Sequence, residues 1–391
     1  MHPASILASS PSPGPSGPPR RAPHTVPFDL VGNHVMLAAT IAERPASLLL
    51  DTGAGGTVLD AGWSASLLSL RRFDQRVRAA GTGQVAATLA GAPTIHVGGA
   101  ELPEPVVVLL PLDGVSRAKG HTVHGVLGFD FLSRYVVEID YAARELRLHE
   151  PSTFEYRGTG AVVPVSLDLR VPVAAAALKA PGRAPVDTRL VLDIGAATLS
   201  VLLSPTVVAA NGGALAGLPG YEAPLGAGVG EDAIGTLTRL EELRLGGLAF
   251  PGPTAGIARA RQGVFALCDG AVGVPVLAQT TPIVDYARRR VILEPSGPLA
   301  PPRHDASGLH LTGGGADGRA VIVAHVAAGS PGAAAGLRPG DEIESVDGRP
   351  LTAASIEELR ELLRREGERR ALVVRRHADT RRVELGLRRM L

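Results

Sequence analysis

The chain has 391 residues, of which 45% are hydrophobic and 20% are charged. This length exceeds one ordinary hydrophobic core, so we expect two or three domains, and the composition is that of a folded rather than a disordered protein. The net charge of +1 gives no indication of binding to nucleic acid or to an acidic membrane surface. The single cysteine, Cys268, excludes a disulfide within the chain.

The first segment, residues 1–27, is rich in proline and serine and is predicted to be a disordered leader. It contains no apolar run typical of a signal peptide, and no run in the chain is long enough for a membrane-spanning helix. We therefore leave the compartment open. The protein is expected in the periplasm or outside the cell if a signal lies upstream, and otherwise in the cytoplasm.

Short apolar or alternating runs, bounded by Gly, Pro or Asp, predict β-strands through most of the chain. In the first part these are residues 35–41, 47–50, 94–97, 106–110, 135–139 and 145–149. In the second part they are residues 190–192, 237–245, 281–284 and 290–293. Helix is expected mainly near the C-terminal end.

Four phrases recur in the same order, which indicates a duplicated lobe. The sequence Asp-Thr-Gly-Ala at residues 51–54 returns as Asp-Ile-Gly-Ala at residues 193–196. A Gly-x-Gly phrase, a phrase beginning at Val97 and one around Gly128 return at similar separations, at Gly228, Leu245 and Gly273. One such match could arise by chance, but four in order imply duplication.

These motifs resemble a family. An apolar run into Asp51-Thr52-Gly53-Ala54, followed downstream by Val126-Leu127-Gly128, resembles a retropepsin lobe, the unit of retroviral aspartic proteases. Two lobes in one chain are similar to the bilobal arrangement of pepsin. The resemblance covers about residues 28–295. It implies a mainly β fold in which lobes 28–152 and 153–296 form one cleft.

The resemblance implies that Asp51 and Asp193 form a catalytic pair. Two carboxyl groups held close together resist simultaneous ionisation, so the pair keeps one proton over an intermediate pH range. The ionised member then accepts a proton from water, while the protonated member polarises the scissile carbonyl group. Taken alone, either Asp could equally be a turn residue after a strand.

The family reading also assigns supporting residues. A hydroxyl after each Asp braces the two loops across the lobe boundary; Thr52 fits this role and Ile194 does not, so half of the brace is expected to be missing. The resemblance implies that flaps close over the substrate at Gly81, Thr82, Gly83, Gly228 and Gly230, although ordinary hairpin turns remain an alternative. Support of the Asp loops is expected from Thr52, Gly53, Ala54, Ile194, Gly195, Gly128 and Gly273.

After a linker predicted at residues 297–306, residues 307–391 resemble a PDZ domain. The motifs are Ser330-Pro331 leading to Gly336-Leu337, then Gly340-Asp341-Glu342-Ile343 and Asp347-Gly348. An amphipathic helix is predicted with Ile356, Leu359, Leu362 and Leu363 on one face, followed by strands at 370–376 and 381–387. The resemblance implies that the domain binds peptide C-termini at Leu309, His310 and Leu311, with a packing role as the alternative.

The leading hypothesis is an aspartic endopeptidase that uses an Asp51/Asp193 pair and whose PDZ domain recruits polypeptide substrates. The alternative, motivated by Ile194, is a catalytically impaired scaffold that binds peptides without hydrolysing them. A homodimer that pairs two Asp51 loops is a third possibility. No cofactor or metal is expected, since this chemistry uses water and carboxyl groups; a monomer is expected, with no nucleic acid and no integral membrane segment.

Overall fold

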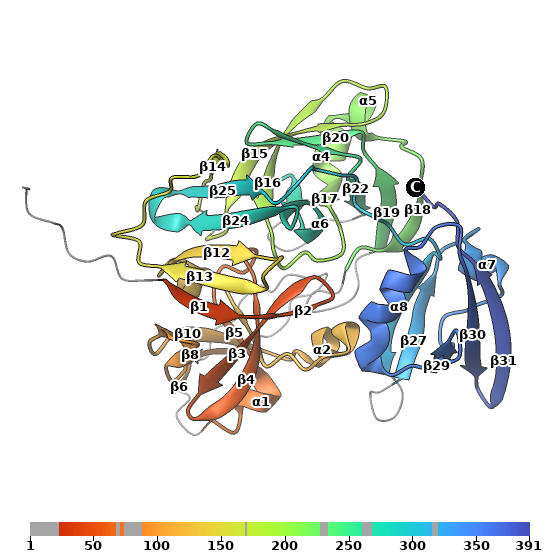
Figure 1. Ribbon diagram of the computed structural model, residues 1–391, viewed down its shortest axis with the longest axis horizontal. Coiled ribbons are helices and arrows are strands. Elements are labelled where there is room, and N and C mark those ends of the chain that lie inside the picture. The colour runs from red at the N-terminus through yellow and green to blue at the C-terminus, as the bar shows by residue number, and fades with distance from the viewer. Residues whose placement is uncertain are drawn as a thin grey trace, which may run out of the picture.

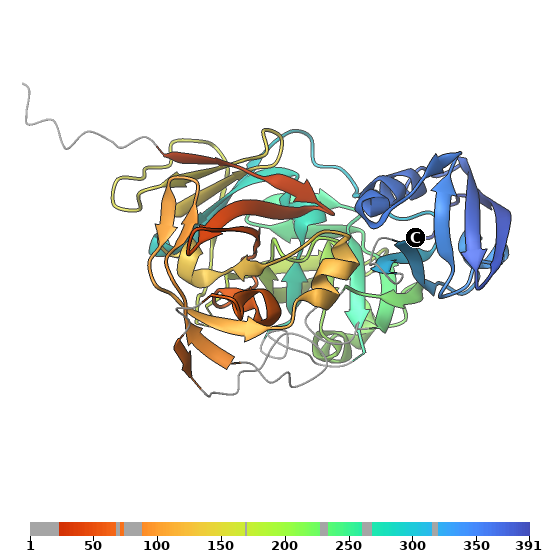
Figure 2. The same ribbon diagram turned by 90° about the horizontal axis from the view of Figure 1, so that it is seen from below.

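The computed structural model of the chain describes residues 23–67, 71–73, 88–168, 170–226, 234–259, 268–314 and 320–391. The described part is mainly β-sheet and has three parts, shown in Figure 1 as a first lobe in red to yellow, a second lobe in green and teal, and a C-terminal domain in blue. Figure 2 shows the C-terminal domain at one end of the two lobes. No helix in these residues is long and apolar enough to cross a membrane.

The first lobe is built on a ten-stranded sheet with the order β6-β7-β10-β5-β11-β4-β3-β8-β9, in which β2 also pairs with β3. The strands are β2 (Asp29–Val31), β3 (His34–Ile41), β4 (Arg44–Leu50), β5 (Val58–Asp60), β6 (Arg71–Phe73), β7 (Thr88–Gly91), β8 (Ile95–Val97), β9 (Ala100–Leu102), β10 (Val106–Leu110) and β11 (Gly125–Leu127). Three short helices accompany them: α1 (Ala61–Ser64), α2 (Asp113–Lys119) and α3 (Phe129–Leu132).

The second lobe has a nine-stranded sheet with the order β18-β19-β22-β17-β23-β16-β15-β20-β21. Its strands are β15 (Val173–Lys179), β16 (Val186–Leu192), β17 (Val201–Leu203), β18 (Gly220–Pro224), β19 (Ile234–Arg239), β20 (Glu242–Leu245), β21 (Leu248–Pro251), β22 (Thr254–Ala258) and β23 (Gly270–Val272). The helices are α4 (Pro205–Ala210), α5 (Gly212–Leu215) and α6 (Val274–Leu277). Position by position, this order repeats that of the first lobe, which confirms the predicted duplication.

A six-stranded sheet, β1-β13-β12-β24-β25-β14, joins the lobes. The first lobe supplies β1 (His24–Pro27), β13 (Glu145–His149) and β12 (Val136–Asp140); the second supplies β24 (Thr280–Asp285), β25 (Arg290–Pro295) and β14 (Ala161–Pro164), with the 3-10 helix η2 (Tyr286–Arg288) after β24. At the centre, β12 pairs antiparallel with β24. Each lobe thus contributes three strands in mirrored order, as expected for a pseudo-twofold axis between them.

Two segments differ from the sequence expectation. His24–Pro27, placed in the leader, form β1 and pair with β13, where Val26 is 2% exposed. The run 237–245, predicted as one strand, is two strands, because Leu240 N–H donates to Pro253 O and Glu241 N–H donates to Lys179 O. The chain passes there from one part of the sheet to another. The leader residues 1–22 lie outside the described residues, and the exact domain boundaries stay predictions.

The C-terminal domain has a six-stranded sheet with the order β26-β27-β28-β30-β31, in which β29 pairs with β28. Its elements are β26 (Leu309–Gly314), β27 (Ala320–Val326), α7 (Pro331–Ala334), β28 (Glu342–Val346), β29 (Arg349–Pro350), η3 (Ala353–Ser355), α8 (Ile356–Leu363), β30 (Arg369–Arg376) and β31 (Asp379–Gly386). The predicted apolar face of α8 is buried at Ile356, Leu359 and Leu363. These side chains belong to a core separate from that of the lobes.

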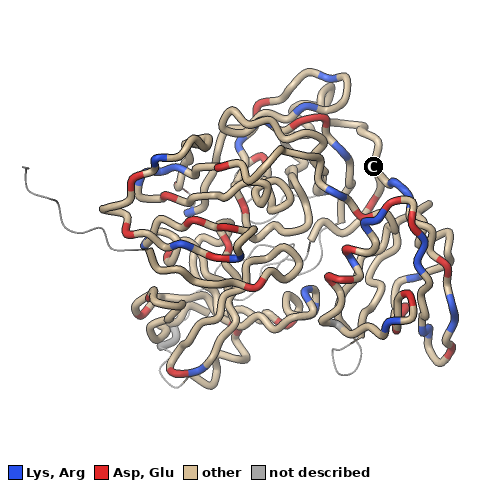
Figure 3. Tube along the Cα trace, viewed as in Figure 1, with Lys and Arg blue, Asp and Glu red and all other residues tan. Residues whose placement is uncertain are grey.

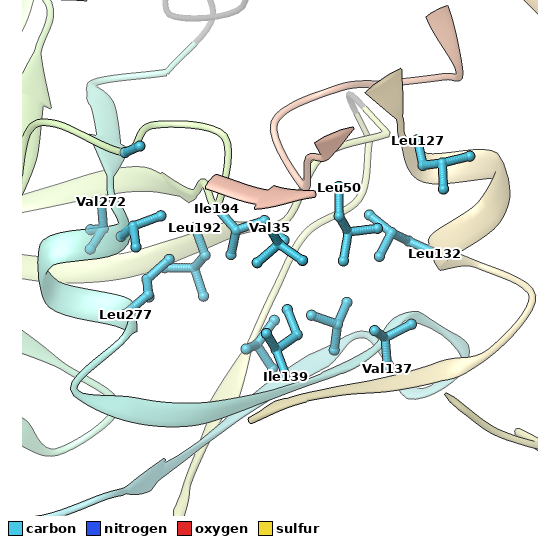
Figure 4. Close-up of a cluster of buried hydrophobic side chains, with 14 of the residues drawn as sticks. Val35, Leu50, Leu127, Leu132, Val137, Ile139, Leu192, Ile194, Val272 and Leu277 are labelled. Carbon is cyan, nitrogen blue, oxygen red and sulfur yellow. The ribbon is translucent and has the colours of Figure 1, made fainter. Parts of the chain in front are cut away.

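The largest core is shared by the two lobes and the joining sheet. Figure 4 shows part of it, with Leu50 and Leu192 from the strands that precede the two aspartates, and Val137 and Ile139 from β12. Each of these side chains is at most 2% exposed. Burial of such side chains stabilises each by about 1.5–3 kcal/mol, so the strands that present Asp51 and Asp193 are firmly held.

The C-terminal domain also contacts both lobes. The strand β26 lies against α2 of the first lobe, and the Arg360 side chain of α8 donates to Ala118 O of α2 (3.4 Å). Towards the second lobe, Tyr221 Oη lies 2.6 Å from His304 Nε2 and His325 Nε2 lies 3.3 Å from Glu222 O. The domain is therefore held against one end of the pair of lobes.

Candidate active site

The two aspartates occupy equivalent places at the ends of buried strands. Asp51 follows β4, which pairs parallel with β11, and Asp193 follows β16, which pairs parallel with β23. Asp51 N–H donates to Leu127 O (3.0 Å), and Asp193 N–H donates to Val272 O (2.9 Å). The same strand pairing and the same terminal bond thus fix both loops.

The two loops bring the carboxyl groups of Asp51 and Asp193 close together across the lobe boundary, because Gly53 lies against the Asp193 carboxyl group and Gly195 against that of Asp51. Gly53 N–H donates to Asp51 Oδ1 (2.7 Å), and Gly195 N–H donates to Asp193 Oδ1 (2.8 Å). Ala196 N–H adds a second bond to the same oxygen of Asp193 (3.1 Å). Each carboxyl group is therefore oriented by the backbone of its own loop.

Burial is the main electrostatic influence on the pair. It raises the pKa of Asp51 and raises that of Asp193 further, because the charge of Asp51 also opposes ionisation of its neighbour. Asp193 is 8% exposed, whereas Asp51 is partly exposed. The arrangement favours a state with the proton on Asp193 and the negative charge on Asp51, as a water-activating pair requires.

The residues after the aspartates brace the loops on one side. Thr52 Oγ1 donates to Leu192 O (2.6 Å) and accepts from Ile194 N–H (2.9 Å). Ile194 has no hydroxyl to return these bonds, and its side chain is 2% exposed in the core beside Leu192, as Figure 4 shows. The second loop thus replaces a polar brace by apolar packing.

Gly128 and Gly273 lie beneath the loops. A Cβ built on Gly128 would lie 2.6 Å from Ala54 O, and one built on Gly273 would overlap Ala196 O and Leu199 O. The residues that follow support the same carbonyl groups, since Phe129 N–H donates to Ala54 O and Val274 N–H donates to Ala196 O, each at 2.9 Å. Only glycine lets the chain come this close, which explains its presence at both positions.

Other predicted residues lie elsewhere. The predicted flap residues Gly81, Thr82, Gly83, Gly228 and Gly230 lie outside the described residues. Leu309, His310 and Leu311 lie on β26 and line a cavity between the C-terminal domain and the lobes. Within the described part of the chain, no group of three or more His, Cys, Asp or Glu side chains is arranged to hold a metal ion.

Beside the pair lie two residues that the sequence motifs do not indicate, His34 and Lys119. Lys119 Nζ donates to His34 Nε2 (2.5 Å), and His34 Nδ1 lies 3.2 Å from Val31 O. The pKa of Lys119 is lowered to about 7, mainly by burial and also by the charge of Arg360, while the charges of Asp51 and Glu357 act in the opposite direction. Figure 3 shows the basic end of α2 facing the acidic first turn of α8.

Lys119 therefore places a positive charge near Asp51, where it lowers the pKa of that carboxyl group against the effect of burial. The sequence holds one weak signal for this residue, because Lys119 and Lys179 are its sole lysines among many arginines. Lys179 is paired with Glu241 on the surface of the second lobe. Nothing local distinguishes the two lysines; their difference comes from the fold.

Comparison with known proteins agrees with this architecture. Residues 37–131 match the family model of aspartyl proteases, and residues 322–376 match that of PDZ domains. Among solved structures, the photosystem II D1 C-terminal processing protease matches with 30% identity over 22% of this chain and 23% of that chain, with a TM-score of 0.21. This match spans less than a quarter of the length of that protease. No curated protein matches the chain.

The second lobe lies outside both family matches, and its likeness to the first rests on the shared strand order. Together the matches support a protease with a peptide-binding domain. The chain thus carries an aspartyl protease domain in its first lobe and a PDZ domain at its C-terminal end, the architecture that the sequence motifs indicate.

Proposed function

We propose that the protein is an aspartic endopeptidase in which Asp51 and Asp193 act as one catalytic pair. The observation that carries this proposal is the close approach of the two carboxyl groups, one from each lobe and each lying against the glycine of the opposite loop, together with their raised pKa values. In the proposed reaction, Asp51 accepts a proton from a water molecule as the water attacks the scissile carbonyl carbon. The carboxyl group of Asp193 gives its proton to the carbonyl oxygen as the C=O double bond opens to a tetrahedral diol. When the diol collapses, the C–N bond breaks, the leaving nitrogen takes the proton held by Asp51, and a diol hydroxyl group returns a proton to Asp193.

This mechanism requires the pair of carboxyl groups to hold one proton, so it predicts a bell-shaped dependence of kcat/KM on pH. At low pH both carboxyl groups are protonated, so none accepts a proton from water. At high pH both are ionised, so none polarises the carbonyl group. Activity is expected between these limits, where the pair holds one proton.

The contacts of the two loops favour pairing within one chain over a homodimer that joins two Asp51 loops. Thr52 of the first lobe bonds to Leu192 and Ile194 of the second, so each Asp51 loop already has a partner. In this proposal the PDZ domain adds a second binding surface for the polypeptide, at the end of the lobes where it is held.

The test is a digest of casein or of a peptide library by the wild-type chain beside the Asp51→Asn and Asp193→Asn variants. Both variants are expected to lose activity by at least about a thousandfold, and a statine-type inhibitor is expected to block the wild type. The matched control is Asp187→Asn, an exposed residue on the same strand that leads to Asp193. Full turnover by either pair variant would contradict the proposal.

Ile194 supports a second candidate function, a scaffold that binds peptides without cutting them. With Ile194 in place of a hydroxyl residue, the second loop lacks the bonds across the lobe boundary that Thr52 makes from the first loop. This candidate predicts saturable peptide binding with no hydrolysis at any pH between 3 and 8, so the digest of the wild type decides between the two.

A further inference from the structure

A cavity of about 300 Å³ lies where the PDZ domain meets the lobes. The strand β26 and the helix α8 line it on one side, and Asn33, Leu199 and Tyr221 line it on the other. The order of the PDZ sheet begins at β26, and among the described residues β26 pairs with β27 and with no other strand. PDZ domains bind peptides by adding a strand to a sheet edge. The helix α2 of the first lobe also lies against β26, so a strand added to the other edge would enter beside α2.

The contacts of Arg360 show which way this edge points. Arg360 lines the cavity from α8, and its Nη2 donates to Leu311 O (2.7 Å). The carbonyl group of Leu311 therefore faces the cavity and α8. An incoming strand would take this bond over from the arginine side chain.

The loop before β26 has its N–H groups already bonded. Ser307 N–H and Gly308 N–H both donate to Asp305 Oδ1, at 2.9 and 2.6 Å. The Ser307 hydroxyl group donates to the same carboxyl group (2.8 Å) and accepts from Leu309 N–H (3.1 Å). Three successive N–H groups are thus satisfied by side chains of the loop itself.

A peptide that ends in this loop would need those N–H groups for its terminal carboxylate. Each N–H group is one donor, and here Asp305 and Ser307 hold all three. The carboxyl group of Asp305 thus bonds the N–H groups that a terminal carboxylate in this loop would use. An internal stretch of polypeptide needs no such donors, because it pairs with the strand edge through its own N–H and C=O groups.

The cavity also adjoins the loop of Asp193. The Asn33 side-chain amide donates to Ala197 O (3.1 Å), and Thr198 and Leu199, which follow directly, line the cavity. The cavity therefore begins a few residues along the chain from Asp193, so a polypeptide bound in it would lie near the loop that carries this aspartate.

We propose that this cavity receives an internal, extended segment of the substrate polypeptide and that Asp305 excludes a free C-terminal carboxylate from it. The inference rests on the proposed function for the identity of the substrate as a polypeptide. It narrows the substrate class to chains that continue beyond the PDZ groove. It also differs from the C-terminal capture that the PDZ resemblance implies.

The test measures binding by the full Asp51→Asn chain at pH 7.5, so that no cleavage interferes. The probes are fluorescent peptides of one sequence with either a free C-terminal carboxylate or a C-terminal amide, and a longer peptide with the same sequence in its interior. We expect affinities for the acid and the amide within twofold of each other, and tighter binding of the longer peptide. A tenfold preference for the free acid, or no saturable binding of any probe, would overturn the proposal.

A second arm adds Asp305→Ala to the same chain. Removing the Asp305 carboxyl group is expected to raise the preference for the free acid over the amide by at least tenfold. The control is Asp379→Asn, which removes an exposed carboxylate on β31 and should leave the ratio unchanged. An unchanged ratio in a folded Asp305→Ala chain counts against the proposal. If this variant does not fold, the acid-to-amide ratio of the first arm still decides. Absence of hydrolysis by the wild type would contradict the proposed function without altering either ratio.

Discussion

Gly195 lies directly against the carboxyl group of Asp51, which belongs to the other lobe, and Gly53 stands in the same relation to Asp193. A Cβ built on Gly53 would lie 2.7 Å from Asp193 Cγ, and one built on Gly195 would overlap the Asp51 carboxyl group more closely still. Each glycine thus does two things: it bonds its own aspartate and makes room for the opposite one.

Gly195→Ala is expected to separate the two carboxyl groups and to lower kcat by at least about a hundredfold, because misplacement by about 1 Å has this effect on oriented catalytic groups. The measurement is steady-state kinetics on a peptide found in the digest. Gly56→Ala is the matched control, since it lies on the Asp51 loop with no atom within 4 Å of an added Cβ. Equal turnover of the two variants would show that the crossed glycines are not required.

The one-sided brace can be tested by moving it to the other lobe. Thr52→Val removes both bonds and leaves Leu192 O and Ile194 N–H unpaired, which is expected to cost about 2 kcal/mol in the free energy of unfolding. Adding Ile194→Thr supplies a hydroxyl from the opposite loop, so the double variant is expected to regain at least half of that loss. Urea unfolding monitored by fluorescence gives the values. A double variant no more stable than Thr52→Val would refute a transferable brace.

Lys119 is expected to set the acidic limb of the activity profile. Its charge lowers the pKa of Asp51, so Lys119→Met should raise that pKa and shift the acidic limb of kcat/KM to higher pH. Lys119→Arg keeps the charge and should restore the profile. Lys179→Met, which removes the other lysine at its pair with Glu241, should leave the profile unchanged. A limb that stays in place in Lys119→Met would exclude this role.

Asp193→Asn is expected to stabilise the fold at neutral pH. The pKa of Asp193 is raised in the folded state, so the folded protein keeps this proton to higher pH than the unfolded chain does. Its favourable contribution is complete below the ordinary pKa of Asp and is lost as the pH rises through the folded pKa. Asparagine has no such loss.

The measurement is the free energy of unfolding of this variant and of the wild type at pH 4 and pH 7. The difference should be larger at pH 7, and Asp187→Asn should show little change at either pH. A difference that is equal at the two pH values would be inconsistent with a buried, raised carboxyl group.

The sequence predicts those features that are local or repeated. The strands around Asp51 and Asp193 and the apolar face of α8 follow from periodicity, and the duplication follows from phrases in constant order. The break at Leu240 was not predicted, because no Gly or Pro marks it and the chain changes partners through backbone bonds. β1 was missed since its proline-rich context is typical of a leader.

The residues of the candidate site also fall into those that sequence motifs predict and those that only the fold brings together. The two aspartates and their glycines stand in recognisable motifs, whereas His34 and Lys119 are far apart in the chain and meet through the folding of β3 and α2. Asp305 lies in a segment predicted as a linker, and its bonds to Ser307 and Gly308 depend on a loop conformation that composition does not reveal. Such residues need the fold to bring them together.

The PDZ domain at one end of the lobes has a further consequence, which concerns direction. A cleft between two identical halves accepts a peptide equally well from its N-terminal or its C-terminal side, because rotation about the twofold axis exchanges the two. Here the two lobes belong to one chain, so a substitution in one lobe leaves the sequence of the other lobe unchanged. Because β26 lies against α2 of the first lobe and Lys119 lies at the end of that helix, the two orientations of a bound chain are no longer equivalent.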